Sequence, residues 1–543
     1  MGKKLFLFIS IFSVLLFFSS NGFSVEFDLG QNTTLDVATT LKWGGAWRVK
    51  GKNKKLIQNI NKDDGDRNFD VGDMINNRFS IIMDTELKYK NFGIFARPRA
   101  YYDFAYTGKN ANDSPFTNNN GPVYGGPLSK TDRFMSETKN LHRDKVEILD
   151  LYTYGEFSLD GHSINIRIGR QVVSWGESIF LLNSISSAQS PLDATAAHTP
   201  GTELRDIFLP VGQVYTQIDL FKNFTLQAYY QWEWEKNRLD EAGSFFSTDD
   251  YLFSAGRRFL VPVMINKGLA ATIDRIGTDY AKNSGQWGIA FRYFAEGLND
   301  TDFGFYIINY HEKMPEIVGR FSGGHLSRDW TKLVPGKTGA ILNLVDGSSY
   351  QIRYGENIRL YGFSFGTEIF DINVSGEFSY RDNYPVMVKD PKNILKFSYK
   401  NASVVQAQIS FIYILSQRLA VLWDDATIMG EVGINRVNGI SGSKLYKDKS
   451  AWGGTVKLTP KYYNFILPNM TLSIPTTYKF NPNGVSSVLG TFKEHSDSFS
   501  IGLSFNYLED YQFGISYTAY LGGPKRNLQA DRDYIAVDFK YTF

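Results

Sequence analysis

Two arginines and two glutamates in one stretch of the sequence could form ion pairs. Arg167 and Arg170 precede Glu177 and Glu203. A guanidinium group can bind a carboxylate through two parallel hydrogen bonds, so Glu177 and Glu203 are candidate partners of Arg170. Such a set either fixes a loop to the wall that carries it or lines a constriction whose charges select solutes, as charged rings do in channels.

Residues of nucleophilic catalysis also occur near one another. Ser187 and Asp193 lie close to His198 in the sequence, and serine–histidine pairs can activate a nucleophile. No spacing sets their geometry, however, and no metal-ligand spacing is present. We therefore expect no catalysis, no cofactor and no metal site. The six histidines are His142, His162, His198, His311, His325 and His495.

The start of the chain predicts export. Lys3 and Lys4 precede an apolar run from Leu5 to Phe18, and small residues follow up to Ser24. This order is typical of a secretory signal peptide, and the run is too short to span a bilayer comfortably as a helix. We expect residues 1–24 to be a cleaved signal peptide and residues 25–543 to be the mature protein.

Composition narrows the class of protein. The formal net charge is +2, which predicts no strong attraction to nucleic acid. The chain has no cysteine, so disulfides and thiolate metal sites are excluded. Aromatic residues make up 15% of the chain, yet its mean hydropathy is −0.26. After residue 24 no stretch is apolar enough for a membrane helix, which leaves a closed β-barrel as the membrane-spanning solution.

Several segments alternate apolar and polar residues, as strands with one lipid-facing side do. The pattern is clear in residues 224–235, 372–381 and 535–543. Because a charge facing mid-bilayer lipid costs roughly 2–4 kcal/mol, Arg167 is expected to face the lumen and Arg170 to lie at the rim. By the same parity the following residues are expected to face inward: Asp150, Glu156, Glu233, Glu235, Glu377, Arg381, Asp538 and Lys540.

The lengths of the connections support the same architecture. We predict an all-β fold, a closed antiparallel barrel of about 18 strands (roughly 16–20). Every second connection is a tight turn, for example residues 370–371, 416–417 and 509–510. The others are longer, as expected for short periplasmic turns and long outer loops. The even count returns the C-terminus to the periplasmic side. The longest predicted loops are 51–76, 108–143, 174–208, 238–283 and 315–354.

One predicted loop differs from the others. Residues 174–208 include the apolar run Ile179 to Leu182 and Ile185, although exposed loops are normally polar. Exposed apolar clusters on a monomer need a partner. We therefore expect this loop to fold inward against the barrel wall and to narrow the pore; a cap over the outer mouth is the alternative.

The final strand ends on an aromatic residue. Ile535, Val537, Phe539, Tyr541 and Phe543 share one face of residues 535–543. A terminal aromatic on the lipid face of a last amphipathic strand resembles the signal that the bacterial barrel-assembly machinery recognises. Phe543 is therefore the candidate assembly signal.

The segment 168–178, Ile-Gly-Arg-Gln-Val-Val-Ser-Trp-Gly-Glu-Ser, resembles the signature of the domain-of-unknown-function 1302 family of bacterial outer-membrane barrel proteins. Residues 200–205, 209–210, 234–240 and 244–250 agree with it. The resemblance implies a large outer-membrane barrel over nearly all of the mature chain. It also implies transport of hydrophobic or lipid-like compounds beside inner-membrane transporters, and it supplies no catalytic residues.

These observations predict a channel or transporter barrel in the outer membrane of a Gram-negative bacterium. A structural or surface-binding barrel is the alternative, and an outer-membrane enzyme is a third class. The expected partners are outer-membrane lipid and lipopolysaccharide, the barrel-assembly machinery, and periplasmic or inner-membrane transport components, with no nucleic acid.

Overall fold

The computed structural model describes residues 25–114, 117, 132–264, 269–320, 330–333, 336–346, 348–391, 393, 397–415, 422–488 and 490–543. The predicted signal peptide, residues 1–24, lies outside the described residues. The same holds for the predicted tight turn at residues 416–417.

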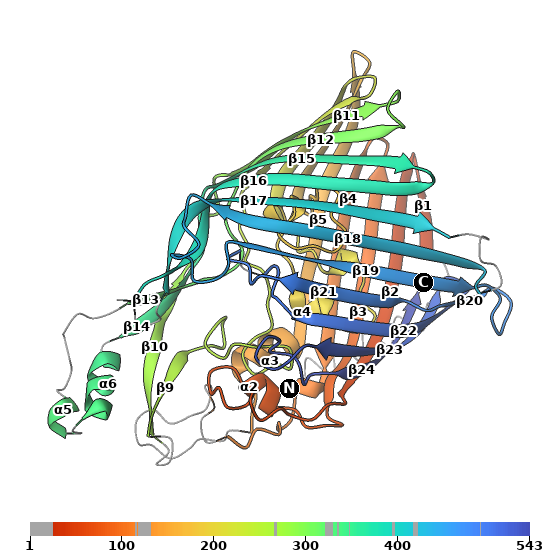
Figure 1. Ribbon diagram of the computed structural model, residues 1–543. Coiled ribbons are helices and arrows are strands. Elements are labelled where there is room, and N and C mark those ends of the chain that lie inside the picture. Colours follow the sequence, from red (N-terminus) through yellow and green to blue (C-terminus); the bar gives the residue numbers. More distant parts are fainter. Residues whose placement is uncertain are drawn as a thin grey trace.

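The strands close into an antiparallel barrel of 18 strands, which confirms the predicted fold class and count (Figure 1). Each strand pairs with its neighbour in the chain, and closure comes from β24 against β2, between Thr40↔Thr542 and Arg48↔Tyr534. The first half of the wall contains β2 (Thr33–Arg48), β3 (Met74–Tyr89), β4 (Phe92–Asp103), β5 (Asp144–Leu159), β6 (His162–Gln171), β7 (Val211–Phe221), β8 (Phe224–Gln231), β11 (Gln286–Ala295) and β12 (Thr301–Tyr310).

The second half of the wall has the same hairpin order. It contains β15 (Ile358–Ile369), β16 (Ile372–Lys389), β17 (Phe397–Ile414), β18 (Asp425–Asn438), β19 (Ser450–Tyr462), β20 (Met470–Ser473), β21 (Thr476–Asn483), β22 (Asp497–Tyr507), β23 (Tyr511–Leu521) and β24 (Tyr534–Thr542). Because β20 and β21 both pair with β19 and with β22, they occupy one position in the wall. A closed sheet leaves no edge, so the wall pairs its backbone polar groups within itself.

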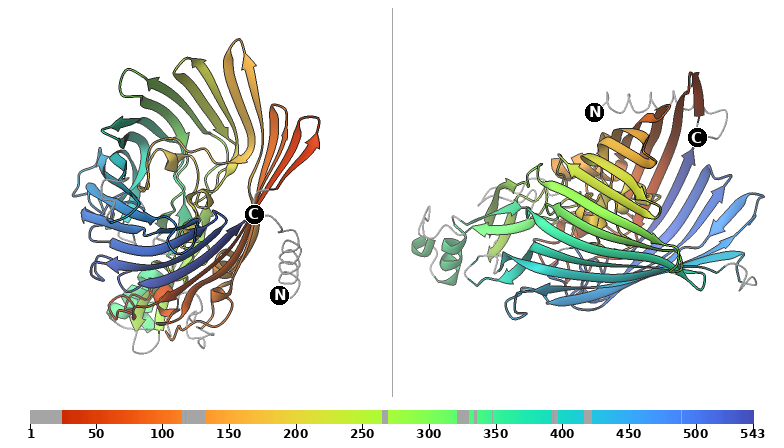
Figure 2. Two further views of the ribbon diagram at one scale, coloured as in Figure 1. Left: turned by 90° about the vertical axis from the view of Figure 1, so that its right-hand side faces the viewer. Right: turned by 90° about the horizontal axis from the view of Figure 1, so that it is seen from above.

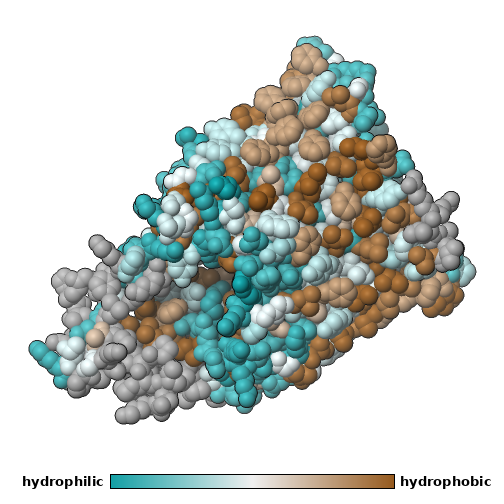
Figure 3. Space-filling model, viewed as in Figure 1, coloured by the Kyte–Doolittle hydropathy of each residue, from teal (hydrophilic) through white to brown (hydrophobic). Residues whose placement is uncertain are grey.

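Alternation along the strands separates an apolar outside from a polar inside. On β24, Ile535 and Phe539 are exposed on the outer surface, whereas Ala536 of the opposite face is buried. On β17, Ile409 is 55% exposed while Gln408 and Ser410 beside it are buried inside. In Figure 3 hydrophobic residues gather over the strands, and hydrophilic residues gather toward the end that carries the long loops. This is the surface expected of a wall that faces lipid.

The tight turns lie where the sequence predicts them. Phe370 and Asp371, between β15 and β16, have φ of 51° and 63°. Positive φ at both central residues of a two-residue turn matches the twist of the flanking strands. Leu508 and Glu509, between β22 and β23, have φ of 54° and 66°.

Two of the predicted long loops contain secondary structure of their own. Strands β9 (Arg258–Met264), β10 (Leu269–Asp279), β13 (Glu316–Arg320) and β14 (Ser349–Arg353) form a second sheet, which we call the outer sheet. Helices α5 (Trp330–Leu333) and α6 (Lys337–Val345) lie beside it, at the end opposite the C-terminus (Figures 1 and 2). Trp234, Ile273, Val345 and Tyr350 belong to its hydrophobic core.

The other long connections carry short helical turns. These are α2 (Asp64–Arg67), η1 (Phe104–Tyr106), α3 (Ser136–His142), η2 (Ser186–Ala188), α4 (Ala194–Ala197) and η3 (Leu204–Asp206). At the end of the barrel opposite the outer sheet, β1 (Val25–Gly30) forms a hairpin with β2. It pairs with Thr33 to Val37, which precede the residues of β2 that pair with β24. In the described part of the chain no helix has the length and apolar character needed to cross a bilayer.

Candidate pore and its inward-folded loop

Residues 174–208, between β6 and β7, fold into the barrel, as predicted; we call them the inward loop. Their first part is held by Glu377 of β16, a 6% exposed carboxylate on the inner wall. It accepts backbone N–H hydrogen bonds from Ser178 at 2.8 Å, from Ile185 at 3.1 Å and from Glu177. Its two carboxylate oxygens together accept three backbone N–H groups, so this one side chain anchors the start of the loop.

A second wall carboxylate, Glu431 of β18, holds the residues that follow. It accepts backbone N–H bonds from Phe180 at 2.5 Å, Leu181 at 2.8 Å and Ile179 at 3.2 Å. The Ser178 hydroxyl donates to it at 2.9 Å. The apolar run that the sequence singles out therefore turns its backbone amides toward Glu431.

Groups on the same wall donate to the carbonyls of the loop. Arg381 of β16, which is fully buried, donates to the carbonyl oxygen of Asn183 at 2.5 Å and to that of Ser184 at 3.0 Å. Gln406 of β17 donates to the carbonyl of Leu182 at 3.1 Å. Acidic wall groups thus bind loop amides and basic or amide wall groups bind loop carbonyls, which satisfies backbone that would otherwise be buried without partners.

Glycines in the wall let the apolar side chains of the loop approach closely. A Cβ atom added to Gly362 of β15 would lie 3.0 Å from Cδ1 of Ile185, and one added to Gly288 of β11 would lie 2.9 Å from the Trp175 ring. The Trp175 ring also packs 5.0 Å from Tyr229, centroid to centroid. The inward loop and this wall therefore share one hydrophobic core.

The last part of the loop contacts the wall near the closure of the barrel. Glu203 pairs with Lys540 of β24 at 2.7 Å, and Asp206 pairs with Lys42 of β2 at 2.6 Å. Burial opposes ionisation of Glu203, but the hydrogen bond from Lys540 and the nearby lysine charges outweigh it and lower its pKa to about 2. Since β2 and β24 are far from β16–β18 in the strand order, the loop crosses the lumen.

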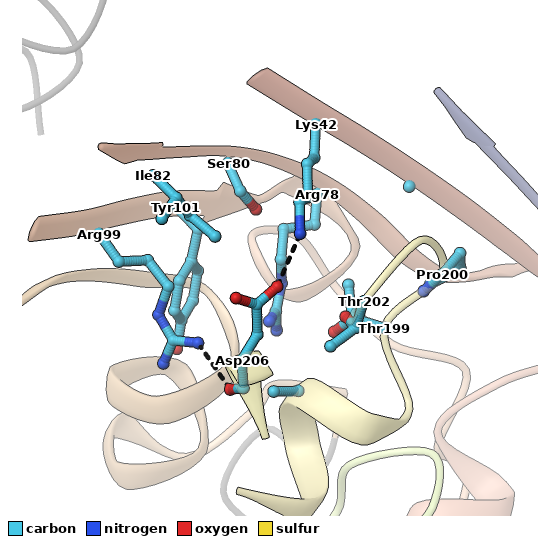
Figure 4. Close-up of a pocket in the computed structure, with 12 residues that line it drawn as sticks. Lys42, Arg78, Ser80, Ile82, Arg99, Tyr101, Thr199, Pro200, Thr202 and Asp206 are labelled. Atoms are coloured by element: carbon cyan, nitrogen blue, oxygen red, sulfur yellow. Dashed lines mark hydrogen bonds and ion pairs between the residues drawn. The ribbon is translucent and has the colours of Figure 1, made fainter. Parts of the chain in front are cut away.

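A small cavity lies between the crossing loop and β2–β4 (Figure 4). It is a cavity of about 30 Å³. A water needs roughly 10–15 Å³ of such space, so only a few waters fit. At its border Lys42 donates to the Asp206 carboxylate and Arg99 donates to the Asp206 carbonyl oxygen (Figure 4). The lining residues are Lys42, Gly44, Arg78, Ser80, Ile82, Arg99, Tyr101, Ala196, Thr199, Pro200, Thr202 and Asp206.

The charges around this gap are paired with opposite charges. Arg99 binds Glu147 at 2.6 Å and Asp193 of the inward loop at 3.3 Å. Arg78 lies 3.5 Å from Asp103. The basic groups that line this cavity are therefore each paired with a carboxylate.

The two arginines of the signature have different surroundings. Arg167 lies inside, with its guanidinium 4.4 Å above the Tyr215 ring. Arg170 lies at the outer end of β6 and pairs with Glu233 at 3.0 Å. The predicted partners Glu177 and Glu203 are wrong for Arg170, because each is drawn inward by its own contacts: Glu177 binds Arg292 at 3.2 Å, and Glu203 binds Lys540.

Glu233 and Glu235 do not belong to the inner wall, contrary to the parity argument. Strand β8 ends at Gln231, so the alternation no longer fixes the direction of the residues beyond it. The chain turns there because Trp234 is buried in the core of the outer sheet, and its N–H donates to Asn283 at 3.0 Å. Glu233 is bound at the rim, and Glu235 is exposed.

The remaining predicted inward residues lie on the inner face of the wall. Asp150 is 3.9 Å from Arg97, and Glu156 is near the periplasmic end, where Asn165 donates to it at 3.4 Å. Asp538 lies against Gly201 of the inward loop. Phe543 is 8% exposed and stacks on Tyr541 at 5.2 Å, so it is more covered than a lipid-facing end residue would be.

The residues considered for catalysis have other partners. His198 pairs with Asp240 at 2.9 Å and stacks on Phe246 at 4.1 Å. Asp193 caps α4 by accepting the Ala196 N–H at 3.1 Å, and it also binds Arg99. The Ser187 hydroxyl contacts that of Ser184 at 3.4 Å.

Sequence reasoning missed Glu431, Lys42 and Arg99 as residues of the loop and the gap. Each sits inside its strand among alternating apolar residues, so the parity rule applied to Glu377 would have found them. Asp206 carried no such signal, because its position depends on the path of the inward loop.

The sequence profile of the family described as "Protein of unknown function (DUF1302)" matches residues 5–543. The chain belongs to this family. The family resemblance seen in residues 168–178 is therefore confirmed over nearly the whole chain. No curated protein sequence matches this DUF1302 member.

Several solved porin structures resemble the DUF1302 barrel at low identity. OccAB3 of Acinetobacter baumannii is 10% identical, with 94% of this chain and 99% of that chain covered and a TM-score of 0.41. OccK2 (OpdF) of Pseudomonas aeruginosa, in complex with glucuronate, is 10% identical (94% and 98% covered, TM-score 0.39). OmpF of Salmonella typhi, in complex with daunomycin, is 8% identical; 96% of this chain and 100% of that chain are covered, and the TM-score is 0.36. The fold assignment rests on the strand pairing of the chain itself.

Proposed function

We propose that this DUF1302 member is an outer-membrane channel whose conductance is restricted by the inward loop. The observation that carries the proposal is the loop itself. It crosses the lumen and is bound at one end by Glu377 and Glu431 and at the other by Lys42 and Lys540. A purely structural barrel has no need of a constriction fixed from both sides of its lumen.

The lining supports passage of small polar solutes. The gap of Figure 4 is bordered by lysine, arginine, serine and threonine side chains together with Asp206. Charged and hydrogen-bonding groups can replace part of the water shell of a polar solute, but they gain little from an apolar one. Because Lys42, Arg78 and Arg99 are each paired with a carboxylate, we expect weak selectivity between ions of opposite sign.

Hydrophobic or lipid-like cargo, which the family resemblance implied, is the second candidate. A shallow apolar depression of about 360 Å³ on the outer surface favours it. Val214, Ala228, Tyr230 and Trp287 line this depression. It faces lipid, and Trp175 of the inward loop packs against the opposite side of the wall at Gly288.

Planar-bilayer conductance tests the channel proposal. The purified barrel should give small steady currents, and deletion of residues 179–199 should raise the single-channel conductance several-fold, because the crossing segment is removed. Heat-modifiable migration on gels confirms that the deletion variant is folded. Unchanged conductance in a folded deletion variant would show that the inward loop does not restrict the pore.

A point-substitution pair sharpens this test. E377Q combined with E431Q keeps the shape of both anchors but replaces one acceptor oxygen of each with an NH₂ group, which cannot accept from the loop amides, so conductance should rise and become noisier. E156Q, near the periplasmic end, is the matched control and should leave conductance unchanged. If the barrel conducts no ions but makes liposomes permeable to a fatty acid, the hydrophobic candidate replaces the polar one.

We also infer that the barrel has no catalytic role, because Ser187, Asp193 and His198 are each committed to structural contacts. Incubation of the purified barrel with ester and peptide substrates should release no product above that of the S187A variant.

A further inference from the structure

Three buried aspartates meet where two outer loops pack together. Asp63 and Asp64 begin the helical turn α2, between β2 and β3, and Asp250 lies between β8 and β9. Their side chains offer carboxylate oxygens that lie within 4.8 Å of one another. The residues are 0%, 1% and 0% exposed, respectively. Carboxylates are almost never fully buried unless a partner neutralises them.

Two oxygens of the cluster have no hydrogen-bond donor. Asp63 Oδ2 accepts from Arg67 Nε at 2.5 Å, and Asp250 Oδ2 accepts from the backbone N–H of Asp64 at 3.2 Å. Asp63 Oδ1 and Asp250 Oδ1 are buried and accept no hydrogen bond from the described residues. A buried polar atom left without a partner costs about 1–3 kcal/mol, and more when it is charged.

The charges that act most strongly on Asp250 are acidic. They are Asp63, Asp64 and Asp249. Asp249 is bound by Lys62 at 2.8 Å, so that lysine is used outside the cluster. Asp250 is thus a buried carboxylate beside three other carboxylates, an arrangement that a bound cation would stabilise.

We propose that Asp63, Asp64 and Asp250 bind a divalent cation, with Ca²⁺ as the ligand. The donors are all hard carboxylate oxygens, which suit Ca²⁺ or Mg²⁺ rather than the softer transition metals. Ca²⁺ accepts irregular sets of oxygen ligands, whereas Mg²⁺ demands near-ideal octahedral geometry. Ligands from two separate loops fit the more permissive ion. The sequence shows no such site because 186 residues separate Asp64 from Asp250.

The bound cation would join the outer loops above the barrel mouth. It bridges residues 51–76 to residues 238–283 directly. The second outer loop, 108–143, reaches the same cluster, because Asn112 and Thr117 each donate to Asp64 at 3.2 Å. Removal of the cation would therefore loosen three loops together.

Calorimetric titration of Ca²⁺ into the EDTA-treated, full mature barrel in detergent tests the proposal. One Ca²⁺ should bind per barrel with a Kd of about 10⁻⁴–10⁻³ M, the range of extracellular calcium modules. D250N should weaken binding at least tenfold, whereas the matched control D249N should stay within about twofold. Absence of binding to the unsubstituted barrel, or equal binding by D250N, would overturn the site. Tighter binding of Mg²⁺ than of Ca²⁺ would overturn the choice of ion.

Thermal melting with Ca²⁺ and with EDTA supplies a second measurement. A purely structural role of Asp250 would not make the effect of D250N depend on Ca²⁺. With Ca²⁺ present, D250N should melt below the unsubstituted barrel. In EDTA the order should reverse, because the substitution removes a like charge from an uncompensated cluster. If D250N melts lower under both conditions, Asp250 is a packing residue and the cation site is rejected.

Discussion

Single side chains on the inner wall decide where the inward loop lies. Glu377 and Glu431 each collect several backbone amides, while Arg381 collects carbonyls, so the wall matches the polarity of the loop group by group. Only the wall side of these contacts could be predicted from the sequence. Parity places Glu377 and Arg381 inside, but no residue pattern shows which loop they bind. The same limit explains the wrong partner for Arg170, since an ion pair depends on how both chain segments turn.

The ion pair between His198 and Asp240 should make the outer part of the inward loop sensitive to pH. Burial alone would lower the pKa of His198, but the Asp240 carboxylate outweighs it and raises that pKa. Burial would raise the pKa of Asp240, but the His198 charge outweighs it and lowers that pKa. The stabilisation that comes from the raised pKa of His198 is complete below about pH 6.5 and is lost as the pH rises through that raised pKa. The stabilisation that comes from the lowered pKa of Asp240 is present above about pH 4.

Proteolysis of the outer loops measures this effect. The unsubstituted barrel should be cleaved more slowly at pH 5.5 than at pH 8.5, and H198Q should abolish the difference. We expect a stability change of about 1 kcal/mol or less, because the pair is partly solvated. H162Q, at a periplasmic turn, is the control and should behave like the unsubstituted barrel. An unchanged pH profile in H198Q would assign the effect to another group.

Whole strands were more predictable than their ends. Alternation with period two and the regular spacing of turns located all the barrel strands, because a wall with lipid on one side and a polar lumen on the other imposes that pattern at every position. Strand β8 was predicted too long, since Trp232 and Trp234 continue the pattern after the wall has ended. The outer sheet was not predicted, because β10 pairs with β14 across a long stretch of chain and its strands face no lipid.

The close approach of β15 to the inward loop can be tested by a pair of glycine substitutions. G362V places a branched side chain against Ile185, which a Cβ alone would approach to 3.0 Å, so the loop must shift. Overpacking of this kind costs typically about 1–3 kcal/mol. In G366V, on the same strand and face, the nearest atom would be 3.5 Å away. We expect faster proteolysis within residues 174–208 for G362V only; equal rates for both variants would show that the contact does not hold the loop.

At the scale of the whole molecule, closure depends on the last strand. β24 joins β23 to β2, so its arrival converts an open sheet with two edges into a barrel with none. Phe543 lies just beyond this strand, and its backbone exchanges hydrogen bonds with Thr39 of β2. The sequence predicted this closing role because an even number of strands brings the C-terminus back to the side of the short turns.

The role of Phe543 as an assembly signal stays a prediction, and a pair of alanine variants addresses it. F543A should reduce the fraction of folded, heat-modifiable barrel in outer-membrane preparations several-fold. F539A removes the same ring type from a lipid-facing position of the same strand, where Phe539 is 43% exposed, and should have a smaller effect. Equal losses in the two variants would indicate that apolar area, not the terminal position, matters for assembly.

The parallel pairing of β10 with β14 constrains the order of events during biogenesis. Between these two strands the chain passes down and up the wall as β11 and β12 before it returns as β13. The two halves of the outer sheet, β9–β10 and β13–β14, can therefore join only after that hairpin is in place. Such long-range pairing forms slowly. The outer sheet should consequently be the last part of the molecule to gain protection from hydrogen exchange, after the wall has closed.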